Sequence, residues 1–266
     1  MEVHHHPHVH SDRHGKKNFK EYFLEFIMIF LAVTLGFIAE NLREHYTEKA
    51  NAKEYARLFL NDLAADTAEF NRTIHVLNRI INAGDSFANL VSRNEMQRIP
   101  AGNLYYHEYW SSWQWRVTPR DATLKQLESS GALRYLGKAA LIKKILDYEE
   151  SLKVIALLEN NQTEDKSSNW KLVQKVFNGK YFVVLDNIKS AAHDSSSNIP
   201  LEDTILHRFL QTDLPLLTND KSEMIELSNW AINSSRSSRT LLKTVSFAKE
   251  KAIEAMDALK KEYGFR

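Results

Sequence analysis

Histidines crowd the start of this chain, which has 266 residues, eleven histidines and no cysteine. Six of them lie within the first fourteen residues: His4, His5, His6, His8, His10 and His14. In an extended segment, side chains two residues apart project from the same side, and Pro7 favours an extended backbone. Imidazole nitrogens placed in this way are ligands for Zn²⁺, Ni²⁺ or Cu²⁺. The spacing therefore makes the tail a candidate metal-binding or pH-responsive segment, and no other cofactor is expected.

Two other interpretations of the histidine-rich tail stay open. A purification tag is usually an uninterrupted run, whereas Pro7 and Val9 interrupt this one. The segment can also be a polar tail that another molecule recognises or that is simply tolerated, and this is the interpretation that we favour. No carboxylate is clearly fixed beside the rings to orient them, as metal-bound histidines usually require.

A second unusual cluster is aromatic and spans residues 104–115, LYYHEYWSSWQW. Its aromatic members are Tyr105, Tyr106, Tyr109, Trp110, Trp113 and Trp115. Aromatic side chains with a polar group are favoured at binding surfaces and at the bilayer interface, so this cluster is a candidate binding patch. The alternative, which we favour, is that these rings close the end of a helical bundle.

Catalytic signatures are absent from the sequence. There is no GxSxG, HExxH, Walker or GxGxxG motif, and without cysteine there is no thiol nucleophile. Outside the tail the histidines are scattered, and adjacent carboxylates such as Glu149 and Glu150 diverge on a helix. The sequence therefore predicts a protein that is not an enzyme and has no catalytic residue.

The overall composition excludes further classes of protein. The net charge is +1, which gives no basic surface for nucleic acid, so no nucleic-acid partner is expected. Only 8 glycines and 5 prolines are present, which argues against a long disordered linker or a turn-rich β-sandwich.

The most apolar stretch is residues 22–39, YFLEFIMIFLAVTLGFIA, whose single charge is Glu25. As a helix it would be about 27 Å long, close to the thickness of a bilayer's hydrocarbon core. The alternative is a buried core helix. Phe37 stands where a small residue precedes a signal cleavage site, so we interpret the segment as an uncleaved signal anchor and single-pass transmembrane helix.

Charges flanking this helix predict its orientation. Four basic residues lie in the ten positions before it and two in the ten after it: Arg13, Lys16, Lys17, Lys20, then Arg43 and Lys49. The excess places residues 1–21 in the cytoplasm and residues 40–266 in the periplasm, across the bacterial inner (plasma) membrane.

One face of the apolar helix carries Glu25, Ala32, Gly36 and Glu40. Ala32 and Gly36 form a small-xxx-small pair, which allows another helix to approach closely. The expected partners are therefore the lipid bilayer and either a second copy of the chain, as a homo-oligomer, or another membrane protein.

Two segments carry a resemblance to a known family. The opening MEVHHHPHVH with KKNFKEYFLEFIMIFLAVTLGFIAENLREHY resembles the N-terminal signature of an uncharacterised family of bacterial single-pass membrane proteins, a domain of unknown function. Residues 122–152, ATLKQLESSGALRYLGKAALIKKILDYEESL, are similar to that family's helical ectodomain. The resemblance implies that the histidines are native, and it carries no activity that could be transferred.

The rest of the chain has helical periodicity. One stripe is Phe59, Leu63, Phe70, Ile74, Leu77 and Ile81, on a helix that we expect to continue from the membrane segment to about residue 91. Another is Leu241, Val245, Ala248, Ala252, Ala255 and Leu259, a bundle or coiled-coil seam. Thr118 and Pro119 predict a helix start. Residues 171–185 form either a hairpin about Asn178 and Gly179 or two helices.

These patterns predict an all-α fold, with one transmembrane helix that continues into an antiparallel helical-bundle ectodomain. The function that follows is a membrane-anchored interaction or scaffold protein of the bacterial envelope. A metal- or pH-responsive membrane protein acting through the histidine-rich tail is the alternative.

Overall fold

The computed structural model describes residues 18–93, 98–194 and 200–265, apart from the side chains of residues 164–168 and 189–203. Within these ranges all regular secondary structure is helical, which confirms the predicted all-α class. The chain divides into two compact units, Met1–Ala52 and Lys53–Arg266. The histidine-rich tail lies outside the described residues.

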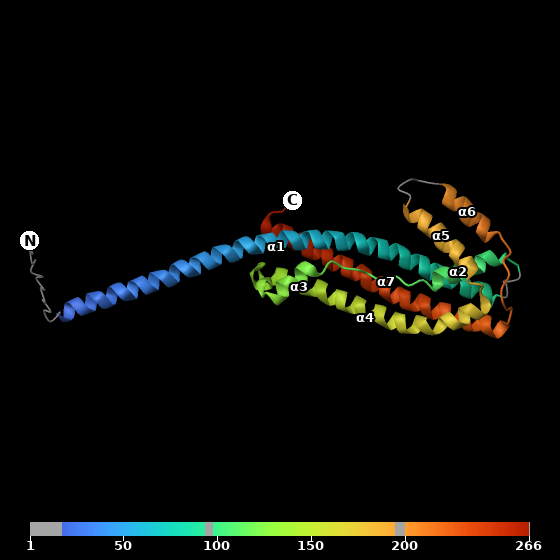
Figure 1. Ribbon diagram of the computed structural model, residues 1–266, viewed down its shortest axis with the longest axis horizontal. Helices are drawn as coiled ribbons and strands as arrows, with labels where there is room; N and C mark the ends of the chain where they lie inside the picture. Colours follow the sequence, from blue (N-terminus) through green and yellow to red (C-terminus); the bar gives the residue numbers. More distant parts are fainter. Residues whose placement is uncertain (1–17, 94–97, 195–199, 266) are drawn as a thin grey trace, which may run out of the picture. The chain divides into compact units, whose positions relative to one another are not determined.

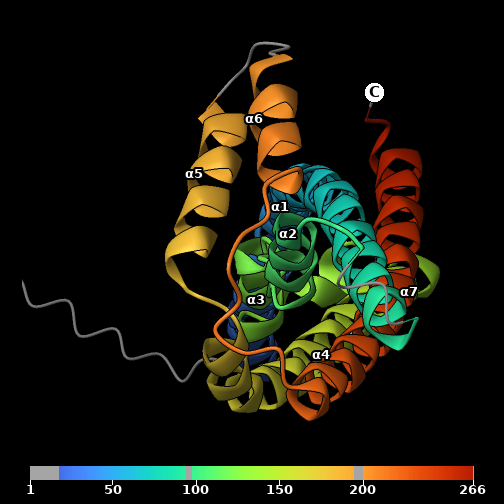
Figure 2. The ribbon, with the colours of Figure 1, turned by 90° about the vertical axis from the view of Figure 1, so that its right-hand side faces the viewer.

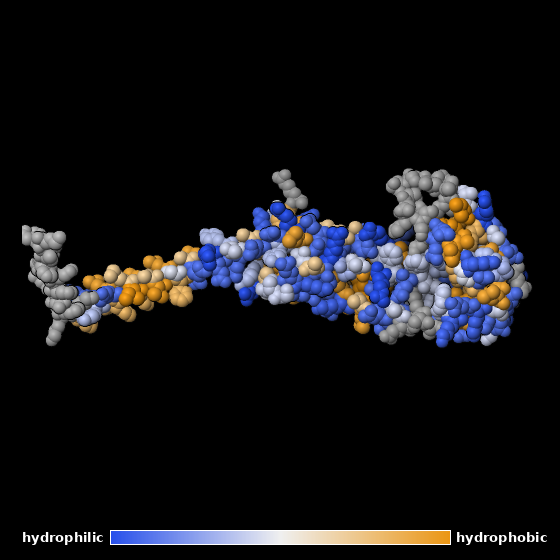
Figure 3. All heavy atoms as spheres, viewed as in Figure 1, coloured by the Kyte–Doolittle hydropathy of each residue, from blue (hydrophilic) through white to orange (hydrophobic). Residues whose placement is uncertain are grey.

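The first unit contains the N-terminal part of helix α1, which runs from Phe19 to Ser92. Its most apolar 18-residue window has a mean hydropathy of 2.2, and 0% of that window is buried inside the protein. A core helix would bury its apolar side chains, whereas here they face outwards, as the hydrophobic colouring of this part of α1 shows (Figure 3). By length and composition this helix can cross a membrane.

The second unit is built on three long helices: residues 53–92 of α1, α4 (Ala139–Val176) and α7 (Lys221–Tyr263). Side chains from all three share one hydrophobic core that includes Phe59, Tyr148 and Val245. α7 lies alongside the other two helices (Figures 1 and 2). Contacts from Lys144 to Glu254 and from Lys175 to Glu223 show that α7 is antiparallel to α4, as predicted for a bundle.

The seam on α7 is buried inside this bundle. Leu241, Val245, Ala248, Ala252, Ala255 and Leu259 all have 0% exposure and belong to the shared core. The small alanines let neighbouring helices approach closely. Because the chain's own helices cover the seam, it is not exposed for contact with a partner. Asp220 caps the start of α7 by accepting hydrogen bonds from two backbone N–H groups, and Gly264 ends the helix with φ of 66°.

A second hydrophobic cluster lies at the other end of this unit. It packs α2 (Ala101–Ser111), α5 (Lys180–Asp194) and α6 (Pro200–Leu210) against the long helices. Helix α4 ends at Val176, Asn178 and Gly179 form the connection, and α5 begins at Lys180. Residues 171–185 are thus two helices rather than a hairpin.

The predicted helix start at Thr118 and Pro119 is wrong, because α3 covers Ala122–Ser129. Residues 112–121, which we call the strap, lack regular secondary structure between α2 and α3. Two buried carboxylates bind their backbone instead: Glu159 accepts from the Val117 N–H at 2.7 Å and Asp66 from the Arg120 N–H at 2.8 Å. A 3₁₀ turn, η1 (Ala132–Tyr135), leads on to α4.

Candidate functional site

The aromatic cluster of residues 104–115 divides between structural positions and a pocket. Tyr105 is fully buried, and its hydroxyl accepts a hydrogen bond from the Asn178 N–H and donates one to the Pro215 carbonyl, both at 2.9 Å. Its ring packs edge-on against Phe177 and Phe182. Burial raises the pKa of the Tyr105 hydroxyl. Tyr105 therefore joins two loops to α2, as the bundle-end interpretation predicts.

Two tryptophans of the cluster also stabilise the fold. Trp110 is buried, and the Arg79 guanidinium lies 4.6 Å from the centre of its ring. The indole N–H of Trp115 donates a 2.9 Å hydrogen bond to Thr73 Oγ1, which holds the strap against α1. Both indole rings therefore contact α1, Trp110 through Arg79 and Trp115 through Thr73.

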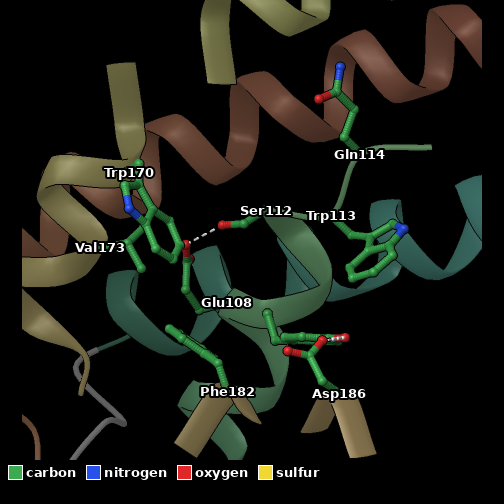
Figure 4. Close-up of a pocket in the computed structure, with 9 residues that line it drawn as sticks. Glu108, Ser112, Trp113, Gln114, Trp170, Val173, Phe182 and Asp186 are labelled. Atoms are coloured by element: carbon green, nitrogen blue, oxygen red, sulfur yellow. Dashed lines mark hydrogen bonds between the residues drawn. The ribbon is translucent and has the colours of Figure 1, made fainter. Parts of the chain in front are cut away.

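Tyr109 and Trp113 instead line an open pocket of about 290 Å³, which we call the aromatic pocket. Its other aromatic walls are Trp170 of α4 and Phe182 of α5 (Figure 4). Ser112, Gln114 and Val173 complete the apolar and uncharged part of the lining. Four structural segments, namely α2, the strap, α4 and α5, thus place one ring each around the same space.

Two carboxylates also line the aromatic pocket. Glu108 is fully buried and accepts a 2.5 Å hydrogen bond from Ser112 Oγ, as Figure 4 shows. Asp186 accepts a 2.6 Å hydrogen bond from the Tyr109 hydroxyl. Burial and the neighbouring Asp186 carboxylate raise the pKa of Tyr109, so this phenol stays protonated and donates. The pocket therefore combines π faces with acidic oxygens.

The chemistry of this lining favours positive charge. Aromatic faces carry partial negative charge and attract cations within about 6 Å of the ring centre. Carboxylates accept strong, charge-assisted hydrogen bonds from ammonium groups. Within the part of the chain that the structure describes, the residues lining the aromatic pocket include no lysine, arginine or histidine.

Two of the scattered histidines meet in a second pocket of about 310 Å³. His75 of α1 and His107 of α2 line it with Arg79 and Tyr106. Burial lowers the pKa of His107, which keeps its ring neutral. Among the described residues no group of three or more histidine, aspartate or glutamate side chains is placed to hold a metal ion.

The predicted association face of the membrane segment is exposed. Glu25, Ala32, Gly36 and Glu40 all lie on the N-terminal part of α1 and face outwards. Apart from the neighbouring backbone of α1 itself, no heavy atom lies within 4 Å of a Cβ built on Gly36. Glu40 pairs with Arg43 one turn further along, at 2.5 Å. These four residues form a separate surface from the aromatic pocket.

Sequence reasoning did not single out Glu108, Trp170, Phe182 or Asp186, which line the pocket. Glu108 stands within the aromatic cluster, and its position one residue before Tyr109 could have drawn attention to it. The other three lie on α4 and α5, far along the chain, and no spacing rule connects them to α2. The pocket becomes recognisable only when the helices are packed.

Comparisons with known proteins identify no relative of this chain. The chain matches no family model, no curated protein and no solved structure. The resemblance of residues 1–10, 16–46 and 122–152 to a family of bacterial single-pass membrane proteins therefore stays a prediction.

Proposed function

We propose that this protein is a membrane-anchored helical interaction protein of the bacterial inner membrane, with no catalytic activity. Residues 1–21 lie in the cytoplasm, residues 22–39 cross the bilayer and the helical body lies in the periplasm. The observation that carries the proposal is the apolar window of α1, of which 0% is buried inside the protein. The N-terminal residues resemble a family of bacterial single-pass membrane proteins, and this resemblance fits the assignment.

The energetic support comes from the large side chains exposed on this part of α1. Their members include Phe23, Phe26, Ile29, Phe30, Leu31, Leu35 and Phe37. Transfer from water to an apolar medium favours each such side chain by about 1.5–3 kcal/mol. Many of them in succession make an aqueous location for this helix strongly unfavourable, and a lipid bilayer covers all faces of the helix at once.

Association is assigned to the membrane segment because the α7 seam is used within the chain. Ala32 and Gly36 make one face of α1 shallow, because alanine has a small side chain and Gly36 has no Cβ. A second transmembrane helix can approach closely there, which strengthens its van der Waals contacts. The proposed partner is a second copy or another membrane protein.

Because the chain has no cysteine, its topology can be tested with single cysteines. Ser11→Cys and Ser129→Cys are expressed in a Gram-negative bacterium and labelled with a membrane-impermeant maleimide, before and after cell lysis. Ser129→Cys should react in intact spheroplasts and Ser11→Cys only after lysis. The reverse pattern overturns the orientation, and recovery of the protein in the carbonate-soluble fraction overturns membrane insertion.

The association surface is tested by in-cell crosslinking, followed by molar-mass determination in maltoside micelles. Gly36→Ile should abolish the crosslinked species, because a branched side chain prevents close approach. Ile38→Leu, on a different face of the same helix, is the matched control and should leave the species unchanged. A monodisperse monomer with no crosslinked partner contradicts the interaction function.

A further inference from the structure

The aromatic pocket has the composition of a site for a positively charged organic ligand. Tyr109 comes from α2, Trp113 from the strap, Trp170 from α4 and Phe182 from α5. Figure 4 shows these elements arranged around one space. Rings on several sides of a cavity are the arrangement that recognises alkylated ammonium groups, because each ring adds its own cation–π attraction.

Trp170 provides an independent reason to expect a ligand. Its side chain is 53% exposed, although tryptophan carries the largest apolar surface of any residue. It lines the aromatic pocket beside Val173, where a ligand would cover the exposed ring. The volume of about 290 Å³ matches the lower end of small-molecule pockets.

The polar groups determine which kind of ligand is favoured. Asp186 brings a carboxylate to the lining, Glu108 lines the pocket as a fully buried side chain, and the described lining residues include no basic side chain. Asp186 Oδ1 accepts a 2.6 Å hydrogen bond from the Tyr109 hydroxyl, and this bond orients the tyrosine ring beside the pocket. An anionic ligand would meet the Asp186 carboxylate and an aromatic lining, so it is disfavoured.

From this lining we propose that the aromatic pocket binds a small organic ammonium ion, with the cation among the four rings and close to Asp186. The ammonium group is either a free solute or the headgroup of a lipid, and the chemistry of recognition is the same for both. The proposal goes beyond the membrane-anchored interaction function and does not depend on it, because every pocket residue lies in the second unit.

The test is a calorimetric titration of the full-length protein in dodecyl maltoside micelles, a detergent without an ammonium group. Choline and ethanolamine are the free probes, and 3,3-dimethylbutan-1-ol is the neutral isostere of choline. Choline or ethanolamine should bind at least about tenfold more tightly than the neutral isostere, since only the cation gains from the rings and carboxylates. Equal affinity for choline and the isostere overturns the proposal, and so does the absence of binding by both cations.

Variants locate the binding in this pocket. Asp186→Asn and Trp170→Ala should each weaken choline binding by about tenfold or more, because each removes one attractive group. Glu226→Gln and Phe247→Ala are matched controls, because both residues are exposed on α7 outside the pocket. If Asp186→Asn and Trp170→Ala fold and bind choline like the wild type, the site is elsewhere and the proposal fails.

Lipid nanodiscs distinguish the two sources of the cation. The titration is repeated in discs of phosphatidylglycerol alone and in discs with added phosphatidylethanolamine. Weaker apparent choline affinity with phosphatidylethanolamine identifies a lipid headgroup as the ligand, whereas equal affinity identifies a free solute. Since the micelle experiment requires no bilayer insertion, its failure is distinguishable from failure of the membrane-anchor proposal.

Discussion

The Tyr109 hydroxyl donates a 2.6 Å hydrogen bond to Asp186 Oδ1, joining α2 to α5 between residues 77 positions apart in the chain. The same two residues line the aromatic pocket. This bond thus has two effects: it fastens a peripheral helix to the body and it orients one ring of the proposed ammonium site. A protonated phenol is needed for both, and burial favours that form.

Tyr109→Phe should lower the free energy of unfolding by about 1 kcal/mol, because it removes this hydrogen bond and leaves the ring in place. The measurement is thermal unfolding in maltoside micelles, followed by circular dichroism. Tyr46→Phe, on a strongly exposed residue of α1, is the control and should have no measurable effect. Equal melting temperatures for Tyr109→Phe and the wild type would show that the bond contributes nothing to stability.

Gly102→Ala should loosen the packing of α2 against the end of α6. A Cβ at this position would lie 2.1 Å from the Phe209 carbonyl oxygen and 3.0 Å from that of Thr212, so backbone must move. We expect a loss of about 1–3 kcal/mol, comparable to that of an overpacked core site, and faster amide hydrogen exchange in α6. Gly179→Ala is the matched control, because nothing lies within 4 Å of its added Cβ.

Ala252→Leu should destabilise the bundle by about 1–3 kcal/mol, since Ala252 has 0% exposure in the seam of α7. The adjacent Ile253 is exposed, so Ile253→Leu should change the stability by less than about 0.5 kcal/mol. Chemical denaturation in micelles measures both values. A tolerated leucine at position 252 would contradict the close packing of the three long helices.

Asp66 and Glu159 should make stability decrease as the pH rises. Burial raises the pKa of both carboxyls above their usual values of 3.8 and 4.5, so the folded protein holds these protons more strongly than the unfolded chain. Their contribution is fully present below the usual values and is lost as the pH rises through the raised ones.

The double variant Asp66→Asn with Glu159→Gln removes both titrations and keeps an oxygen that accepts the strap's N–H groups. From about pH 3 to pH 7, its stability relative to the wild type should rise with pH, by at most about 1.4 kcal/mol per pH unit for each carboxyl. Melting temperatures across this range provide the measurement. Glu226→Gln, at an exposed position, is the control, and parallel curves for the double variant and the wild type would contradict the role of burial.

Sequence periodicity predicted the long helices because each buried stripe repeats on one face of its own helix. Phe59 and Leu259 follow this rule, and both are buried as expected. The strap does not follow the local pattern. Thr118 and Pro119 have the residue types of a helix start, yet the carboxylates of Asp66 and Glu159 bind the backbone N–H groups on either side of them. Those partners are distant in sequence, so local patterns do not reveal them.

The aromatic pocket was predictable only in part, for the same physical reason. Tyr109 and Trp113 belong to a conspicuous local cluster. Trp170, Phe182 and Asp186 reach the same space because α4 and α5 fold back beside α2, which is a property of tertiary packing. The sequence also does not separate packing residues such as Tyr105 from pocket residues such as Tyr109.

The bundle core joins early and late parts of the chain, so it can close only late in biosynthesis. Ser235 of α7 donates a hydrogen bond to the carbonyl of Ile81 in α1, across 154 positions. Domains generally fold as units, and the ribosome adds about 5–20 residues per second. Contacts between residues so far apart in the sequence make folding slower. The apolar segment of α1 therefore leaves the ribosome long before its own body can close, and the apolar stripes of α1 and α4 depend on α7 for their cover.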